Sequence, residues 1–229
     1  MALLRRLEGD VRSGESYALV LALLLASLVV GIVAPETTWA RVVRDSVLSV
    51  TIVVAYWTAT RRRAFLVPGV LLPSAALVFV LVGALEGART HAVTAAIGAV
   101  LVGTVACLVT RDLLQRGRVT METVFAALSF YVLLGMFFGL VYMFLADVGD
   151  TAFFARGDDG TSGEHLYYSF VAISTTGFGD LAPATGIGRA LTVLEIVLGQ
   201  LYLVTVVAVL VSTAADRRLT AVRRHGVDD

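Results

Sequence analysis

The chain has little of what a water-soluble or disulfide-linked domain needs. Only 16% of its 229 residues are charged, lysine is absent, and 18 arginines balance 18 acidic residues. A net charge of zero provides no field that would attract nucleic acid, so none is expected as a partner. The single cysteine, Cys107, can form neither an intrachain disulfide nor a cysteine-based metal site. It lies in an apolar stretch and is expected to be a small core residue.

Long apolar runs dominate what is present. Hydrophobic residues make up 58% of the chain, and its mean hydropathy is +0.85. A membrane-spanning helix needs about 20 mostly apolar residues. Six stretches qualify: 17–33, 42–60, 64–85, 92–110, 121–146 and 187–214. The second has Arg44 and Asp45 near its start, and the third contains Pro68 and Pro73. We therefore expect an all-α integral membrane protein with six transmembrane helices.

The arginines predict how these helices are oriented, because cytoplasmic loops are enriched in basic residues. With the N-terminus inside, the inner face receives Arg5, Arg6, Arg12, Arg61, Arg62, Arg63, Arg111, Arg116, Arg118, Arg217, Arg218, Arg223 and Arg224. The outer face receives only Arg41, Arg44, Arg89, Arg156 and Arg189. This predicts a multi-pass protein of the cell membrane with both termini in the cytoplasm. A cleaved signal peptide at 17–33 is the alternative, but its charged leader is long and the following APETTWA is a poor cleavage pattern.

The stretch from Asp147 to Gly186 is too polar to span a membrane. Within it, HLYYSFVAIS (165–174) is apolar but too short to cross, so it suits a half-helix that enters the membrane and stops. The chain must then return outward through 175–183 to reach the last span. Irregular backbone survives at membrane depth only inside protein or beside a watery cavity. The sequence therefore predicts a re-entrant loop at STTGFGDLAP (174–183).

The residue types in this loop suit a pore for a bare cation. Such a pore must replace the water shell of the ion, and a row of backbone carbonyls can do so if all of them face one axis. An ordinary strand alternates its carbonyls, so some residues must take positive φ, which glycine adopts freely. Gly177 and Gly179 alternate with Thr176 and Phe178 as that backbone requires. The hydroxyl of Thr175 offers one more oxygen ligand.

TTGFGD (175–180) resembles the signature of the potassium-channel superfamily, most often threonine, valine, glycine, tyrosine, glycine and aspartate. The resemblance runs from about Met121 to Ala214. It implies a selectivity filter formed by Thr175, Thr176, Gly177, Phe178 and Gly179, with K+ bound at the first four. It implies filter support by Asp180, Tyr167 and Tyr168, a hinge at Gly199, and cavity-lining positions at Gln200, Leu203 and Val207. It also implies a homotetramer around one pore, with K+ as permeant ion and no other cofactor.

Three positions depart from the family pattern. Phe178 replaces a tyrosine whose hydroxyl helps to brace the filter, and Thr176 replaces a valine. Val171 stands where some members carry a glutamate bonded to the filter acid. These differences bear on filter rigidity and inactivation more than on potassium selectivity.

Several residues have more than one interpretation. Glu195 is an acid within a span, and it can act as a cavity charge, as a titrating gate element or as a hydrogen-bonded strut behind the half-helix, which we favour. Gly199 suits close packing as well as a hinge. Tyr167 and Tyr168 can be membrane-interface anchors. His165 suits a helix start that faces water, with an external pH sensor as the second interpretation.

The domain pattern consists of a cytoplasmic segment (1–16), a four-helix domain (17–110), a linker (111–120), a pore domain (121–214) and a short cytoplasmic tail (215–229). The pore domain comprises an outer helix (121–146), a pore helix (165–174), a filter (175–180) and an inner helix (187–214).

The four-helix domain resembles a voltage sensor, but its fourth span, 92–110, contains no arginine, so no steep voltage dependence is expected. The tail is too short for a ligand-binding domain, so ligand gating would need a regulatory partner.

A potassium-selective channel is the leading interpretation of function. A weakly selective cation channel is the alternative, although both filter glycines and the aromatic residue are present. A potassium-transporter subunit is disfavoured because related transporters carry four filter repeats in one chain. An enzyme has no support, since the chain lacks a serine elbow, an HExxH motif and paired intramembrane carboxylates.

Overall fold

The computed structural model describes residues 2–59, 75, 77, 78, 81, 88–115 and 120–225, with side chains at 16–59, 75, 77, 78, 81, 90–113 and 120–209. Its helices are α1 (Ala2–Val33), α2 (Thr38–Ala59), α4 (Ala88–Gln115), α5 (Met121–Val148), α6 (Ser162–Ile173) and α7 (Gly186–His225). All of these except α6 are long and apolar enough to cross a membrane. The expected all-α membrane architecture is confirmed at this level, and a total of six spans stays a prediction.

The helices extend beyond the apolar stretches that predict them. α1 begins at Ala2, and α7 continues to His225, past the predicted boundary at 214. α4 continues to Gln115, so the first half of the predicted linker 111–120 is helical, while residues 116–119 lie outside the described residues. The predicted third span, 64–85, also lies outside them apart from four isolated positions.

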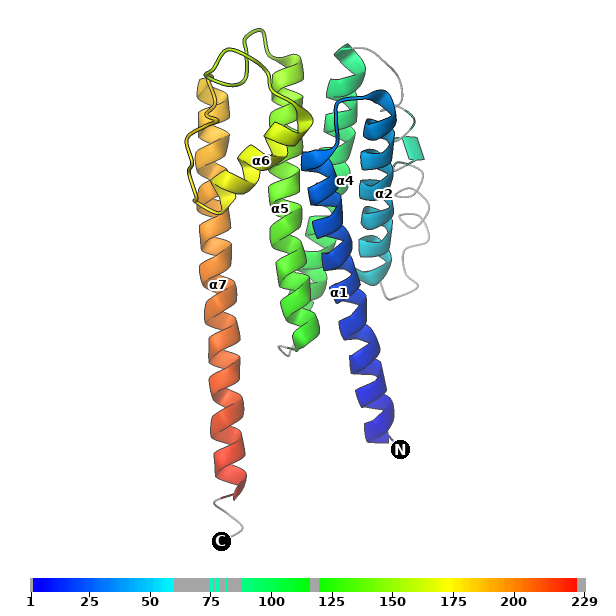
Figure 1. Ribbon diagram of the computed structural model, residues 1–229. Coiled ribbons are helices and arrows are strands. Elements are labelled where there is room, and N and C mark those ends of the chain that lie inside the picture. Colours follow the sequence, from blue (N-terminus) through cyan, green and yellow to red (C-terminus); the bar gives the residue numbers. More distant parts are fainter. Residues whose placement is uncertain are drawn as a thin grey trace.

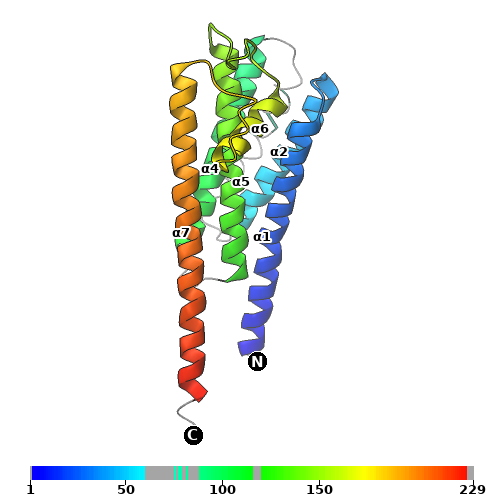
Figure 2. The ribbon, with the colours of Figure 1, turned by 60° about the vertical axis from the view of Figure 1, so that its left-hand side comes forward.

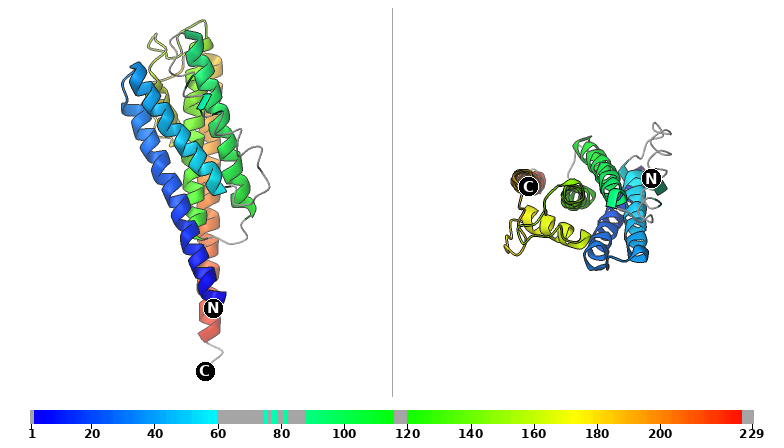
Figure 3. Two further views of the ribbon diagram at one scale, coloured as in Figure 1. Left: turned by 90° about the vertical axis from the view of Figure 1, so that its right-hand side faces the viewer. Right: turned by 90° about the horizontal axis from the view of Figure 1, so that it is seen from above.

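Both termini lie at the same end of the bundle (Figure 1). α1 and α5 run from this lower end to the upper end, and α2, α4 and α7 run downward. Seen from above, α5 lies between two groups of helices, with α1, α2 and α4 on one side and α6 and α7 on the other (Figure 3). In agreement with this view, α5 packs against α1, α4, α6 and α7.

An apolar core joins the N-terminal helices to α5. Its members include Tyr17 and Leu24 of α1, Ile52 of α2, Val102 of α4 and Leu133 of α5, all buried. These side chains recur at helical spacing along their segments, which directs one apolar stripe of each helix into the shared core. Through this core the N-terminal helices rest on α5, which in turn supports α6.

α6 lies very close to α5 because two glycines face it. A Cβ at Gly135 would lie 2.8 Å from Cζ of Phe170, and one at Gly139 would lie 2.8 Å from Cδ2 of Leu166. Contacts that short do not occur between real carbon atoms, so a side chain at either position would push α6 outward. The glycines thus set the depth at which the short helix lies against its neighbour.

The expectation that Cys107 is a core residue is wrong, because its side chain is exposed. The buried face of α4 carries Val102, Val105, Ala106 and Val109. Successive residues of a helix are turned by about 100°, so Cys107 points out of the bundle beside the buried Ala106. Hydropathy alone does not distinguish the two faces of a span, because the face toward lipid is as apolar as the face toward the protein core.

Candidate ion-conducting site

α6 begins at Ser162, three residues before the predicted start of the pore helix at His165. Oγ1 of Thr161 accepts a hydrogen bond from the backbone N–H of Glu164 at 3.2 Å, and the Glu164 carboxylate accepts one from the N–H of Thr161 at 2.7 Å. This reciprocal pair is a capping box. The sequence contains a signal for a helix start here, the T-x-x-E spacing at 161–164, which the prediction did not use.

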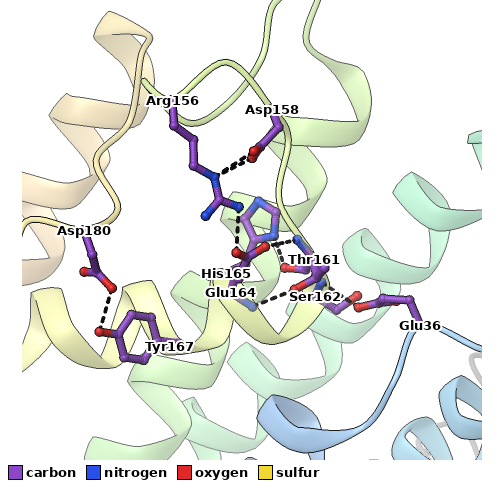
Figure 4. A network of polar contacts seen from close by, with 9 residues as sticks. All are labelled: Glu36, Arg156, Asp158, Thr161, Ser162, Glu164, His165, Tyr167 and Asp180. Carbon is purple, nitrogen blue, oxygen red and sulfur yellow. Dashed lines mark hydrogen bonds and ion pairs between the residues drawn. The ribbon is translucent and has the colours of Figure 1, made fainter.

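Charged residues from distant parts of the chain gather around the start of α6 (Figure 4). The guanidinium of Arg156 donates to Asp158 at 2.7 Å and to Glu164 at 2.6 Å. The carboxylate of Glu36, in the α1–α2 loop, accepts from the N–H of Ser162 at 2.9 Å. A carboxylate at a helix N-terminus satisfies free N–H groups and complements the helix dipole. The loop between α1 and α2 therefore holds the N-terminal end of α6 directly.

The ion-paired cluster also alters the protonation of its members. Partial burial alone raises the pKa of Glu164, but hydrogen bonds from Thr161 and Arg156, together with the charge of Arg156, outweigh it and lower the pKa below its ordinary value. Hydrogen bonds to the carboxylates of Asp158 and Glu164 raise the pKa of Arg156. Both groups are therefore charged at neutral pH, as the ion pair requires.

The interpretation of His165 as a start residue facing water is wrong. Its side chain is 2% exposed and packs beside the rings of Phe153 and Phe154, with centroids 5.3 Å and 5.1 Å away. Nδ1 lies 2.8 Å from the carbonyl oxygen of Thr161, which can only accept, so Nδ1 carries the hydrogen. Nε2 is buried without a hydrogen-bond partner among the described residues. The aromatic outer loop covers this residue because the helix starts one turn earlier than predicted.

After α6 the backbone adopts the alternation that the glycine spacing predicts. φ is 58° at Thr175, 61° at Gly177 and 78° at Gly179, and it is not positive at Thr176 or Phe178. Positive φ at every second residue brings successive carbonyls toward one side of the chain, whereas an extended strand alternates them. A Cβ at Gly177 or Gly179 would meet no atom within 4 Å, so backbone conformation and not space requires glycine there.

Thr175 was not expected to share this conformation. A β-branched residue at positive φ is strained, at a cost of about 1–3 kcal/mol. The Thr175 hydroxyl donates to the carbonyl of Ser174 at 2.7 Å, and Nε2 of Gln200 donates to it at 3.4 Å. The strained residue is thus held by a hydrogen bond from α7.

The predicted filter segment, 175–180, lies on the surface of the single chain. α6 ends about halfway down the bundle, and the segment returns upward near α7 (Figures 1 and 2). Every residue from Ser174 to Asp180 is exposed, including Phe178 at 68%. A polar loop at this depth needs protein or water on its open side.

The two tyrosines of α6 have different partners. The hydroxyl of Tyr167 donates to Asp180, the last residue of this segment, at 2.9 Å (Figure 4). The hydroxyl of Tyr168 lies 2.7 Å from Oγ1 of Thr192 on α7. Tyr167 therefore contacts the predicted filter acid, Asp180, while Tyr168 joins α6 to α7.

A short antiparallel pairing anchors the outer end of the filter segment. The N–H of Ala155 donates to the carbonyl of Ala182, and the N–H of Ala184 donates to that of Phe153, both at 2.8 Å. The loop that follows α5 thus clamps the chain between Asp180 and α7.

The inner end of α6 is packed tightly against α7. A Cβ at Gly199 would lie 2.5 Å from Cγ1 of Ile173 and 3.0 Å from its carbonyl oxygen. That carbonyl also accepts a hydrogen bond from Tyr131 of α5 at 3.2 Å. Gly199 therefore has a packing role, and its role as a hinge stays a prediction. Leu203 and Val207 follow on α7, the first partly and the second largely exposed, and their place in a cavity also stays a prediction.

Glu195 lies fully buried where α5, α6 and α7 meet. Its Oε2 accepts from the hydroxyl of Tyr142 at 2.6 Å, and its Oε1 lies 2.5 Å from Oγ of Ser169. Ser169 also lies 2.6 Å from the carbonyl oxygen of Gly135. This is the arrangement that the strut interpretation describes. Its partners Tyr142 and Ser169 were not identified from the sequence.

A comparison with known protein families identifies the same part of the chain. Residues 119–216 match a family model described as "Ion channel". These residues comprise α5, α6, the filter segment and the apolar part of α7. No curated protein matches the chain. The family match and the apolar helices support a multi-pass membrane protein in which 119–216 is similar to an ion channel, and the match points to a non-enzymatic protein.

Proposed function

We propose that this chain is one subunit of a homotetrameric, potassium-selective channel whose filter is 175–180. The observation that carries the proposal is the alternation of positive φ at Thr175, Gly177 and Gly179, directly after a half-helix. Four such segments around one axis would supply stacked rings of carbonyl oxygens. Such rings replace the hydration shell of K+, and the Thr175 hydroxyls add one more ring.

The exposed surfaces support a tetramer. One chain leaves its filter segment uncovered, and α7 exposes Val193, Val197, Leu201 and Val204 among other apolar residues. Neighbouring copies would cover both surfaces and would close the pore. Native mass spectrometry in detergent should then give an assembly of four times the 24.3 kDa chain mass. A monomer or dimer that still conducts would contradict this part of the proposal.

The proposal includes the predicted topology: a six-span chain of the cell membrane, its termini cytoplasmic, with 17–110 as a sensor-like domain before the pore domain 121–214. α2 and α4 run in the same direction, which one further crossing between them would produce (Figure 1). Both termini lie at the end opposite the filter, which agrees with an outer filter and an inner tail.

A flux assay with two matched substitutions tests the filter. Gly177→Ala places a side chain at positive φ, whereas Gly186→Ala adds the same methyl group at the start of α7, where nothing lies within 4 Å. In potassium-loaded vesicles, G177A should abolish valinomycin-independent K+ efflux, and G186A should leave it within about twofold of the unmodified chain. Equal efflux from both variants would contradict the assignment of 175–180 as the filter.

A further inference from the structure

The surroundings of the Glu195 carboxyl group favour its neutral, protonated form. It is buried in the wall between the outer helix, the half-helix and the inner helix, and its contacts are two hydroxyl groups. Among the described residues no basic side chain pairs with it. A buried carboxylate without a cation is strongly disfavoured, and it gains a proton when the site permits.

The number of hydrogens available for these hydrogen bonds also indicates a protonated carboxyl group, independently of its burial. The hydroxyl of Ser169 has one hydrogen but lies within 2.6 Å of the Gly135 carbonyl oxygen and 2.5 Å from Oε1 of Glu195. If Glu195 were ionised, one of these contacts would bring two oxygens together with no hydrogen between them. If Glu195 is protonated, Oε1–H donates to Ser169, Ser169 donates to Gly135, and Tyr142 donates to Oε2. Each contact then has one hydrogen.

We propose that Glu195 is protonated at neutral pH, and that the neutral carboxyl is a positioning residue which fastens α6 between α5 and α7. Through Ser169 it fixes the half-helix six positions before Thr175. The assignment of the proton does not depend on the proposed function. Its effect on conduction does, because conduction requires the filter that α6 carries.

Other titratable groups lie near Glu195, and each could influence whether its carboxyl group is protonated. Tyr142 and Tyr131 of α5 and Tyr168 of α6 face the same region, and Glu195 acts on all of them electrostatically. All of them are phenols, which are neutral at physiological pH, so none supplies a positive charge. If Glu195 ionises at alkaline pH, its proton passes to water. Ser169 then keeps only one of its two contacts.

Infrared spectroscopy of the purified protein at neutral pH tests the proton directly. The difference spectrum between the unmodified chain and Glu195→Gln should contain the carbonyl stretch of a protonated carboxyl group. The matched Glu164→Gln difference should contain carboxylate bands only, because Glu164 is ion-paired with Arg156. If the Glu195→Gln difference contains only carboxylate bands, the proposal is overturned. This readout requires no conduction, so a failed proton assignment is distinguishable from a failed channel proposal.

Conduction of three variants then tests the positioning role. The amide of Glu195→Gln can donate to Ser169 and accept from Tyr142, as the neutral acid does, so its current should stay within threefold of the unmodified chain. Glu195→Leu has similar bulk without these bonds and should lose at least tenfold. Tyr142→Phe removes one donor but leaves the proton, and should keep the infrared band. Loss of current in E195Q to the level of E195L would overturn the positioning role of the neutral form.

Discussion

The hydroxyl of Tyr167 donates a hydrogen bond of 2.9 Å to the carboxylate of Asp180, joining the half-helix to the outer end of the filter segment. In the proposed filter, Phe178 has no hydroxyl with which to brace the loop, so this bond would be one of its braces. Tyr167→Phe removes this bond and should shift the proposed filter toward a nonconducting form.

Single-channel recording measures this shift as a lower open probability or faster inactivation. Tyr168→Phe is the matched control, since it removes the hydroxyl that contacts Thr192 and leaves Asp180 bonded. If Y168F and Y167F change inactivation equally, the bond to Asp180 has no special part in filter stability.

Gly199 should be intolerant of any side chain. Gly199→Ala would place a methyl group 2.5 Å from Ile173, which costs about 1–3 kcal/mol as overpacking. We expect a lower temperature of tetramer dissociation together with reduced current. A bend at Gly199 without a packing role would instead alter opening and leave thermal stability unchanged. Comparison with G186A, where the added methyl group meets nothing, separates the two.

The cluster at the start of α6 should make folding stability sensitive to acid. The folded pKa of Glu164 lies below its ordinary value of 4.5, so its contribution is fully present above that pH. The contribution is lost as pH falls through the folded pKa. Thermal unfolding of Glu164→Gln should therefore differ from that of the unmodified chain at neutral pH, and the difference should shrink as the pH falls below 4.5 and through the folded pKa. An equal difference at all pH values would contradict this role.

Voltage should have little influence on opening. Each charge that crosses the membrane field contributes about 2.3 kcal/mol per 100 mV, and α4 has no arginine or lysine between Arg89 and Arg111. The basic residues near the outer end of α2 are engaged: Arg44 pairs with Asp45, and Arg41 is bonded to His91. A conductance–voltage curve should be shallow. A steep sigmoid equivalent to several gating charges would contradict the prediction.

The sequence was most informative where backbone conformation depends on residue type. Glycine spacing predicted positive φ at Gly177 and Gly179, and the polar break between apolar runs predicted a short helix. Contacts between distant residues were not predictable, because no local pattern records them. Glu36 bonds Ser162 across 126 positions, and Tyr142 bonds Glu195 across 53. The exposure of Cys107 was not predicted either, because a helix that faces lipid has no polar stripe to distinguish its outward face.

The most direct test of the central claim is the reversal potential of the purified protein in a planar bilayer, with K+ on one side and Na+ on the other. A potassium-selective filter at 175–180 predicts a reversal close to the K+ equilibrium potential, and loss of the current in G177A. A sustained, single-channel current that reverses near zero would contradict the claim. A filter that carries Thr176 and Phe178 would then belong to a weakly selective cation channel.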